Sequence, residues 1–273
     1  MKFAFVSTMG GVPWAGSEEL WWGAAMRLLD AGHHVAANCV GHDTLPEKLA
    51  KFESKGGQLH RRQKPSRAIR LVDRVRGASA SERGYQWLDQ VQPDRVVISQ
   101  SCQDGVGWGA ACASRGISFD LITQVVAEYY WPNDTKSAEA GEVLAKARRC
   151  YFVSKGNVEL TERQLGVSLA NAEVVWNPFN VVPPQSFHWP EESPLRIACV
   201  ARLDPRHKGQ DLLLQGLAGR KWRHRRFELT FFGRVLARSH FDVSRPSWIC
   251  TASNLPDTST MSERFGTPIM YLY

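Results

Sequence analysis

The sequence lacks the long hydrophobic run that a membrane span requires. Apolar residues make up 43% of the chain, but they fall in short runs, and none approaches the roughly 20 consecutive apolar residues of a transmembrane helix. The first run, Phe3–Val6, also ends too soon to form the core of a signal peptide. These absences predict a cytoplasmic protein, at most peripheral to the inner face of a membrane.

Metal-binding and disulfide motifs are missing as well. The six cysteines lie far apart with no C-x-x-C pair, and neither H-E-x-x-H nor D-x-D occurs. We therefore expect buried free thiols, no metal site and no cofactor. The cysteines are Cys39, Cys102, Cys112, Cys150, Cys199 and Cys250.

Negative charge is in short supply. The formal net charge is +7, and two basic runs, residues 60–76 and 220–226, carry much of it. Such an excess favours anionic partners, namely nucleotide phosphates, anionic lipid or nucleic acid. We expect the run 60–76 to be the solvated face of a helix with a flanking loop. Because aromatic residues are not interleaved with it, nucleic acid is disfavoured, whereas contact with an anionic membrane surface stays open.

What the chain does contain is an alternation of short strands and helices. Phe3–Val6 predicts a buried strand, and a glycine-rich loop, Gly10–Gly16, follows it. Ser17 is the expected N-cap of a helix that ends at Gly32, and His34–Val40 is the next strand. This β-loop-α-β opening predicts a parallel sheet.

The same alternation continues along the chain and then restarts. Further strands are expected at 95–99, 120–126, 150–153, 172–176, 195–201 and 227–233, with helices at 107–115, 134–148, 157–165 and 209–217. We predict an α/β fold with an N-terminal Rossmann-like domain at 1–181, a doubly wound parallel sheet. A proline-rich linker at 182–194 and the first βαβ unit of a second Rossmann-like domain at 195–233 follow. Residues 234–273 show no clean period and are expected to be a poorly ordered tail.

The loop after the first strand is one candidate binding element. Gly10, Gly11 and Gly16, followed by Ser17, would let backbone N–H groups approach a phosphate or a sugar at a helix N-terminus. A tight turn with no ligand explains the same residues equally well. The spaced dinucleotide fingerprint is absent, and no acidic residue follows the second strand to hold a ribose, which disfavours a dehydrogenase.

The second candidate is the segment from Arg202 to Lys208. Arg202 follows a predicted strand and Lys208 immediately precedes a predicted helix. Two cations beside a helix N-terminus at a strand's carboxyl end suit a diphosphate. The alternative is an ordinary solvated loop.

The sequence of this segment resembles the signature motif of the family-4 glycosyltransferases, which have the GT-B fold. The resemblance rests on R-L-D at 202–204 followed by K-G-Q-D-L-L-L at 208–214. Three upstream segments are similar to other sequence motifs of that family. They are the loop 10–19, F-V-S-K-G-N at 152–157 and V-V-W-N-P-F-N at 174–180. The likeness covers residues 1 to about 233.

The resemblance implies retaining, metal-independent transfer of a sugar from a nucleotide-diphosphate sugar to an acceptor that is a glycan or lipid-linked. Arg202 and Lys208 would hold the donor diphosphate, and the loop with Gly10, Gly11, Gly16 and Ser17 would line the cleft between the domains. Trp14 and Trp131 would serve the acceptor side. Gln124 or Glu128 stands near the position at which some relatives carry a histidine, and no catalytic residue is assigned.

One expected element of the family is missing. Two glutamates seven residues apart, which hold the donor's sugar and ribose in that family, do not occur after Gly233. We therefore expect a chain truncated or frameshifted after about residue 234, and inactive as a transferase. The alternative is a non-catalytic binding remnant of such an enzyme.

Overall fold

The chain forms two compact units, Met1–Val182 and Pro183–Tyr273, and each is considered by itself. The computed structural model describes residues 1–63, 80–179, 186, 194–222, 224–233 and 248–253. Most of the predicted linker and tail, and residues 64–76 of the first basic run, lie outside the described residues. Within the described residues, no helix is long and apolar enough to cross a bilayer.

The first unit is built on a seven-stranded sheet in which every neighbouring pair is parallel. The strands are β1 (Lys2–Ser7), β2 (His34–Val40), β3 (Gln58–Arg62), β4 (Arg95–Ser101), β5 (Ser118–Val125), β6 (Arg149–Phe152) and β7 (Ala172–Val174). Their order is β3-β2-β1-β4-β5-β6-β7. The order reverses between β1 and β4, which confirms the predicted doubly wound sheet.

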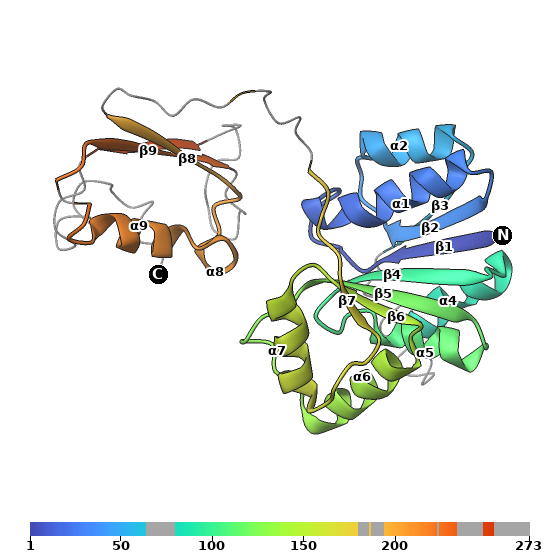
Figure 1. Ribbon diagram of the computed structural model, residues 1–273. Helices are drawn as coiled ribbons and strands as arrows, with labels where there is room; N and C mark the ends of the chain where they lie inside the picture. Colours follow the sequence, from blue (N-terminus) through green and yellow to red (C-terminus); the bar gives the residue numbers. More distant parts are fainter. Residues whose placement is uncertain (64–79, 180–185, 187–193, 223, 234–247, 254–273) are drawn as a thin grey trace. The chain divides into compact units, whose positions relative to one another are not determined.

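Helices cover this sheet from both sides (Figure 1). They are α1 (Glu19–Asp30), α2 (Glu47–Ser54), α4 (Ala80–Val91), α5 (Val106–Ser114), α6 (Asp134–Lys146) and α7 (Lys155–Leu165). On one face, Trp21 of α1 and Phe52 of α2 bury Phe5 of β1. On the other face, Trp108 of α5 and Leu144 of α6 belong to a second core cluster. The strand alternation that produces these two faces was readable from the sequence.

Local signals explain where several helices begin and end. The Ser154 hydroxyl accepts a hydrogen bond from the Asn157 N–H and caps α7, which ends at Gly166 in the left-handed conformation (φ 65°). The Asn133 side chain caps α6 in the same way. Ser17 does not cap α1, contrary to expectation. Instead, Gly16–Glu18 forms a short 3₁₀ turn ahead of that helix, with no side-chain cap.

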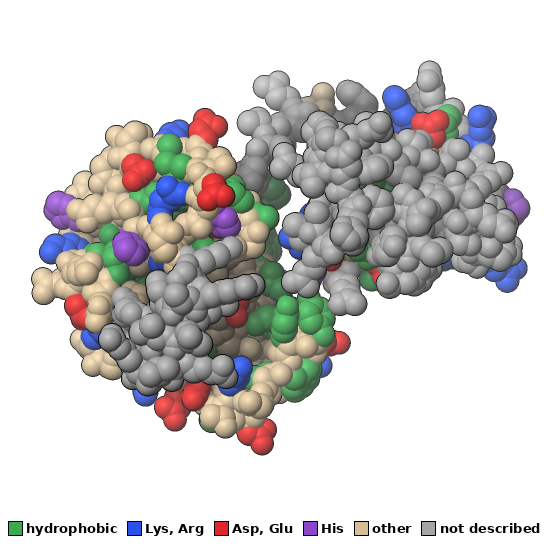
Figure 2. All heavy atoms as spheres, turned by 180° about the vertical axis from the view of Figure 1, so that it is seen from behind, with side chains coloured by type: hydrophobic (Ala, Val, Ile, Leu, Met, Phe, Trp, Pro, Cys, Tyr) green, Lys and Arg blue, Asp and Glu red, His purple; other side chains and the backbone are tan. Residues whose placement is uncertain are grey.

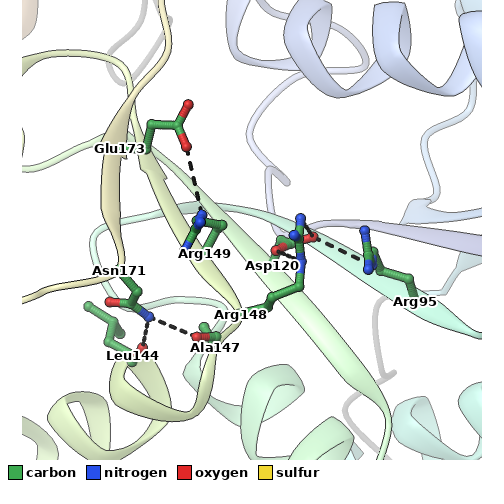
Figure 3. A network of polar contacts seen from close by, with 8 residues as sticks. All are labelled: Arg95, Asp120, Leu144, Ala147, Arg148, Arg149, Asn171 and Glu173. Carbon is green, nitrogen blue, oxygen red and sulfur yellow. Dashed lines mark hydrogen bonds and ion pairs between the residues drawn. The ribbon is translucent and has the colours of Figure 1, made fainter.

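A polar network spans the amino ends of β4, β5 and β6 (Figure 3). The Asp120 carboxylate is almost fully buried, and Arg148 binds it through Nε (3.0 Å) and Nη2 (3.3 Å). Arg95 approaches it from β4 at 4.0 Å. Nearby, the Asn171 amide donates to the carbonyls of Leu144 and Ala147 at the end of α6. The arginines compensate the buried charge of Asp120, and the Asn171 amide satisfies carbonyls at the end of α6 that have no partner within the helix. The network lies at the amino ends of the strands, away from their carboxyl ends.

The second unit carries a smaller sheet of order β10-β9-β8. Its elements are β8 (Leu195–Val200), α8 (Pro205–Lys208), α9 (Gln210–Ala218), β9 (Phe227–Gly233) and β10 (Trp248–Ser253). β8 and β9 are parallel, as the predicted βαβ unit requires, and Leu217, Phe227 and Leu229 form the centre of its core. β10 falls in the segment that was expected to lack regular structure. It pairs antiparallel with β9, whose backbone groups would otherwise stay unpaired at a sheet edge.

The thiols are less uniformly buried than predicted. Cys39, Cys112 and Cys150 are buried, and burial raises the pKa of each to about 12. Cys102, directly after β4, and Cys199, near the end of β8, are only partly buried. The side chain of Cys250 lies outside the described residues.

Candidate functional site

The first candidate region lies where the strand order of the large sheet reverses. β1 has β2 on one side and β4 on the other. In open α/β sheets, ligands bind beside the carboxyl ends of the strands at such a switch point. The segments that leave this edge are the glycine loop after β1, residues 102–105 after β4 and residues 126–133 after β5.

The glycine loop leaves open space in front of its backbone. A Cβ added at Gly11 or Gly16 would meet no atom within 4 Å, and one at Gly10 would make only an ordinary contact, 3.5 Å from Val40. None of these three glycines has a positive φ. The fold itself therefore does not demand glycine at these positions, and the space in front of Gly11 and Gly16 leaves their backbone open to an approaching group.

Glu18 was missed from the sequence as a member of this region. Its side chain is 3% exposed and accepts hydrogen bonds from the indole N–H of Trp21 (3.0 Å) and the hydroxyl of Ser17 (3.5 Å). Burial raises the pKa of this carboxyl, although hydrogen bonds and the charge of Arg62 act against the shift. Ser17, which was predicted to line the cleft, is thus hydrogen-bonded to the buried side chain of Glu18.

Trp14 lies in the loop but is not an open stacking surface. Its indole N–H donates to Glu19 (2.7 Å), and Lys48 forms an ion pair with the same carboxylate. Its ring packs against Trp21 and Trp22 at centroid distances of 6.3 and 6.4 Å. Trp14 is half-buried and anchors the loop to α1.

Arg62 is the second residue that the sequence did not reveal. It ends β3, and its guanidinium crosses β2 to reach β1, donating to both oxygens of Asn38 and to the carbonyl of Ser7. The Trp108 ring lies 5.4 Å from its Cζ. Its neighbours His60 and Arg61 made it look like part of a solvated run, but burial lowers the pKa of this arginine. The sequence offered no signal for this role, because the strand that Arg62 ends was not predicted either.

Backbone strain marks the end of β4 in the same region. Cys102 has a φ of 50°, a left-handed conformation that side chains other than glycine rarely adopt. Its N–H donates to the Val125 carbonyl at 2.6 Å, and the β4–β5 register shifts between Gln100 and Ser101. Such strain concentrates at functional sites.

The three predicted acceptor-side residues at the end of β5 and after it, Gln124, Glu128 and Trp131, differ in exposure. Gln124 is 7% exposed, and its Oε1 accepts from the Asn177 amide at 3.1 Å. Its Nε2 has no hydrogen-bond partner among the described residues. The Glu128 carboxylate is exposed and 3.8 Å from Arg163, and Trp131 is 58% exposed.

The second candidate region lies in the second unit, around the start of α9. Arg202 follows β8, and its Nη2 lies 2.7 Å from Oδ2 of Asp204. His207 shares that oxygen at 2.9 Å. Burial opposes ionisation of Asp204, but hydrogen bonds from His207 and Arg202 outweigh it and lower the pKa of this carboxyl.

Lys208 and Gln210 flank the left-handed Gly209 in this region. Lys208 is exposed, whereas Gln210 is buried and donates to the Arg202 carbonyl at 2.7 Å. Nε of Arg202 is buried without a hydrogen-bond partner among the described residues. The fold thus holds both predicted cations beside the first turn of α9.

No group of three or more His, Cys, Asp or Glu side chains that could hold a metal ion occurs in the part of the chain that the structure describes. The candidate regions contain backbone N–H groups, amides, an arginine and a lysine, together with carboxylates. Glu18, Glu19 and Asp204 are paired, whereas Oδ1 of Asp211, in the first turn of α9, has no partner among the described residues. Such groups suit anionic and hydroxyl-bearing ligands.

Comparison with known proteins identifies the fold. No protein-family model matches the sequence. No curated protein matches it either. Among solved structures, Alr3699/HepE of Anabaena in complex with UDP has a TM-score of 0.54 at 15% identity, over 80% of this chain and 57% of that chain. Its complex with UDP and glucose has a TM-score of 0.54 at 14% identity, over 86% and 62%. This chain therefore has an α/β fold of the GT-B type and spans about three fifths of the length of those structures.

Proposed function

We propose that this chain binds a nucleotide-diphosphate sugar through Arg202 and Lys208, as part of a sugar-transferring protein. The observation that carries the proposal is that Arg202 precedes the one-turn helix α8 and Lys208 ends it, directly before the Gly209 N-cap of α9. The structures that share the fold contain UDP and UDP-glucose, which supports a uridine nucleotide as the first ligand to test.

Arg202 and Lys208 would act by electrostatic stabilisation. In the proposed transfer, the bond from the anomeric carbon to the β-phosphate oxygen breaks, and that oxygen leaves with the electron pair. A bond to an acceptor hydroxyl oxygen forms on the same face, and the hydroxyl proton passes to the departing diphosphate. A guanidinium and an ammonium fixed beside that diphosphate favour its departure without a metal ion. Nε of Arg202 is buried and has no hydrogen-bond partner among the described residues, so the proposal requires this side chain to turn toward the phosphate.

The first unit would supply the acceptor side of the reaction. The space in front of Gly11 and Gly16 suits a polar group bound by backbone N–H groups, and Ser17 offers a hydroxyl beside it. Glu18 and Arg62 would hold this edge in place from within the fold rather than contact the ligand, since both are largely buried. Peripheral contact with an anionic membrane stays a prediction.

Binding without transfer is the second candidate function. The observation that favours it is the antiparallel pairing of β10 with β9, since a doubly wound domain continues with further parallel strands. A partial donor domain could retain the diphosphate contacts while lacking groups that hold the sugar.

The test measures binding and turnover separately. Calorimetric titration with UDP should show saturable binding that weakens on the order of tenfold or more in both Arg202→Ala and Lys208→Ala. Lys221→Ala, a matched exposed cation of the same unit, should bind as the wild type does. Equal affinity in all four proteins would refute the assignment.

An activity assay with UDP-glucose, in which the release of UDP is measured, distinguishes the two candidate functions. Turnover that falls with the Arg202→Ala substitution supports a transferase. Binding with no turnover in the presence of varied sugar acceptors supports the binding protein.

A further inference from the structure

One carboxylate oxygen of the second unit serves two nitrogen donors at once. Oδ2 of Asp204 lies 2.7 Å from Nη2 of Arg202 and 2.9 Å from Nδ1 of His207. Figure 2 shows acidic and basic side chains interspersed over the described surface of the first unit, where an ion pair such as Arg115–Asp89 joins one acid to one base. A shared oxygen behaves differently, because a change at one donor alters how strongly the oxygen holds the other.

Asp204 occupies a position where its side chain would ordinarily bind the backbone. It is the N-cap residue of α8, and aspartate is preferred there because its carboxylate accepts from free N–H groups of the first turn. Here the side chain makes no cap hydrogen bond, and the N–H groups of His207 and Lys208 donate to the Asp204 carbonyl. The carboxylate is therefore committed to the two side-chain donors.

The backbone around Arg202 is fixed, so its side chain is the part that can move. The Arg202 carbonyl accepts from the amide of the buried Gln210 at 2.7 Å. The Ala201 N–H donates to the Phe232 carbonyl, and an added Cβ at Gly233 would overlap the Ala201 carbonyl. The Arg202 side chain itself is partly exposed, and a partly exposed ion pair is weak enough to exchange partners.

The other charged groups at this corner come from α8 and α9. Lys208 ends α8 and is exposed, and Asp211 lies in the first turn of α9 with no partner for its Oδ1 among the described residues. The side chain of Arg206 lies outside the described residues. The end of β9, which adjoins this turn, carries no charged residue. Among the described side chains of this corner, His207 is the type that changes charge near neutral pH.

The hydrogen positions of the network follow from the charge of Asp204. Burial opposes its ionisation, but hydrogen bonds from His207 and Arg202 outweigh burial and lower the pKa of this carboxyl, so it is ionised near neutral pH. An ionised carboxylate only accepts, so Nδ1 of His207 carries the hydrogen of the 2.9 Å bond. The proton that charges the imidazole therefore binds at Nε2. Because a charged donor forms the stronger hydrogen bond, protonated His207 competes better with Arg202 for the shared oxygen.

We propose that Asp204 restrains Arg202 in the free protein and that protonation of His207 releases it, so that the second unit binds a diphosphate more tightly at lower pH. The effect on the diphosphate rests on the function proposed above, whereas the exchange of partners at Asp204 does not. When Arg202 turns to a phosphate oxygen, His207 remains as the partner of Asp204. Binding of the diphosphate is then accompanied by the uptake of up to one proton at His207.

Calorimetric titration with UDP-glucose at about pH 6 and about pH 8 tests the link to pH, because the phosphates of this ligand do not titrate in that interval. The affinity of the wild type should be about fivefold higher at the lower pH, within the limit that one proton sets. His207→Gln should lose this dependence. His224→Gln removes an exposed histidine of the same unit and should keep it.

Asp204→Asn tests the restraint itself. It removes the carboxylate that holds Arg202, so UDP-glucose should bind about threefold more tightly than to the wild type at about pH 8, and without the pH dependence. Asp211→Asn removes the same charge from the neighbouring turn and should keep the pH dependence. Weaker binding by Asp204→Asn would mean that Asp204 holds Arg202 in its binding position, and the restraint would be refuted.

A measurement without ligand separates this inference from the proposed function. With ¹⁵N-labelled arginine, the side-chain resonances of Arg202 should shift between about pH 8 and about pH 6 in the wild type and stay in place in His207→Gln. If they do so and UDP-glucose does not bind, the restraint stands and the donor assignment fails. If the resonances do not respond to pH, the restraint is refuted. If UDP-glucose binds equally at both pH values, the restraint is likewise refuted, while the donor assignment stands.

Discussion

The two candidate regions use arginine in opposite ways. In the first unit, Arg62 lies within the fold, where its guanidinium joins three neighbouring strands and faces Trp108. In the second unit, Arg202 follows a strand of a much smaller sheet, is partly exposed, and meets a carboxylate only two residues away. The first arginine is committed to structure, whereas Nε of the second has no hydrogen-bond partner among the described residues. A basic residue near a strand end is therefore not by itself evidence of a binding site.

The largest effect is expected where the half-buried Arg62 is removed. Arg62→Ala would leave the Ser7 carbonyl and both Asn38 oxygens without their donor, and Glu18 without a compensating charge. We expect the free energy of unfolding of the first unit to fall by about 3 kcal/mol or more, measured by denaturant titration. Arg61→Ala is the matched control, because the Arg61 side chain is exposed and, among the described residues, donates to a single acceptor, the His42 carbonyl. A similar loss in both variants would show that Arg62 has no special structural role.

Glycines provide the next contrast within the first unit. A Cβ at Gly57 would overlap the buried ring of Phe52, whereas one at Gly16 would meet nothing. Gly57→Ala should therefore lower the free energy of unfolding by about 2 kcal/mol, while Gly16→Ala should change it by less than about 0.5 kcal/mol. Gly16→Ala should nevertheless reduce ligand binding or turnover. An unimpaired Gly16→Ala protein would show that this glycine merely forms a turn.

The buried Glu18 carboxyl makes a smaller, pH-dependent contribution. Because its pKa is raised in the folded state, folding favours the protonated form. Stability from this group is present below the carboxyl's ordinary pKa and is lost as pH rises toward the raised value. One proton limits the slope to about 1.4 kcal/mol per pH unit. Glu18→Gln should flatten the decline when free energies of unfolding are measured from pH 4 upward, and an unchanged slope would contradict the assignment.

The smallest effect is expected for the arginine of the second unit. Its pair with Asp204 is partly exposed, so Arg202→Ala should change the stability of this unit by less than about 1 kcal/mol. Hydrogen exchange of the β8 and β9 amides would measure it. A loss as large as that of Arg62→Ala would mean that Arg202 also serves the fold, and the contrast between the regions would disappear.

The sequence was sufficient for elements that follow local rules. The apolar run at Phe3 and the glycine at Gly32 locate β1 and the end of α1, and the second strand, His34–Val40, matches β2. β3 was missed because its residues, Q-L-H-R-R, show little apolar alternation. It pairs with β2 along one edge of the sheet, so tertiary context rather than its own pattern makes it a strand.

The site was predictable only in part. Sequence motifs pointed to two candidate binding segments, the glycine loop and the segment from Arg202 to Lys208. The partnership of Glu18 and Arg62 joins residues far apart in sequence, and only the folded sheet brings them together. Trp14 was predicted as an acceptor-side residue because it stands in a loop after a predicted strand. In the structure its indole N–H donates to Glu19 and its ring packs against Trp21 and Trp22.

The most direct test of diphosphate binding by Arg202 observes its Nε atom. With ¹⁵N-labelled arginine, the Nε–H resonance of Arg202 can be observed by NMR while UDP is added, with uridine as the ligand that lacks phosphate. Because this nitrogen has no partner in the described structure, the account predicts a saturable downfield shift with UDP and none with uridine. No shift with UDP, or the same shift with both ligands, would contradict the claim that Arg202 binds the diphosphate.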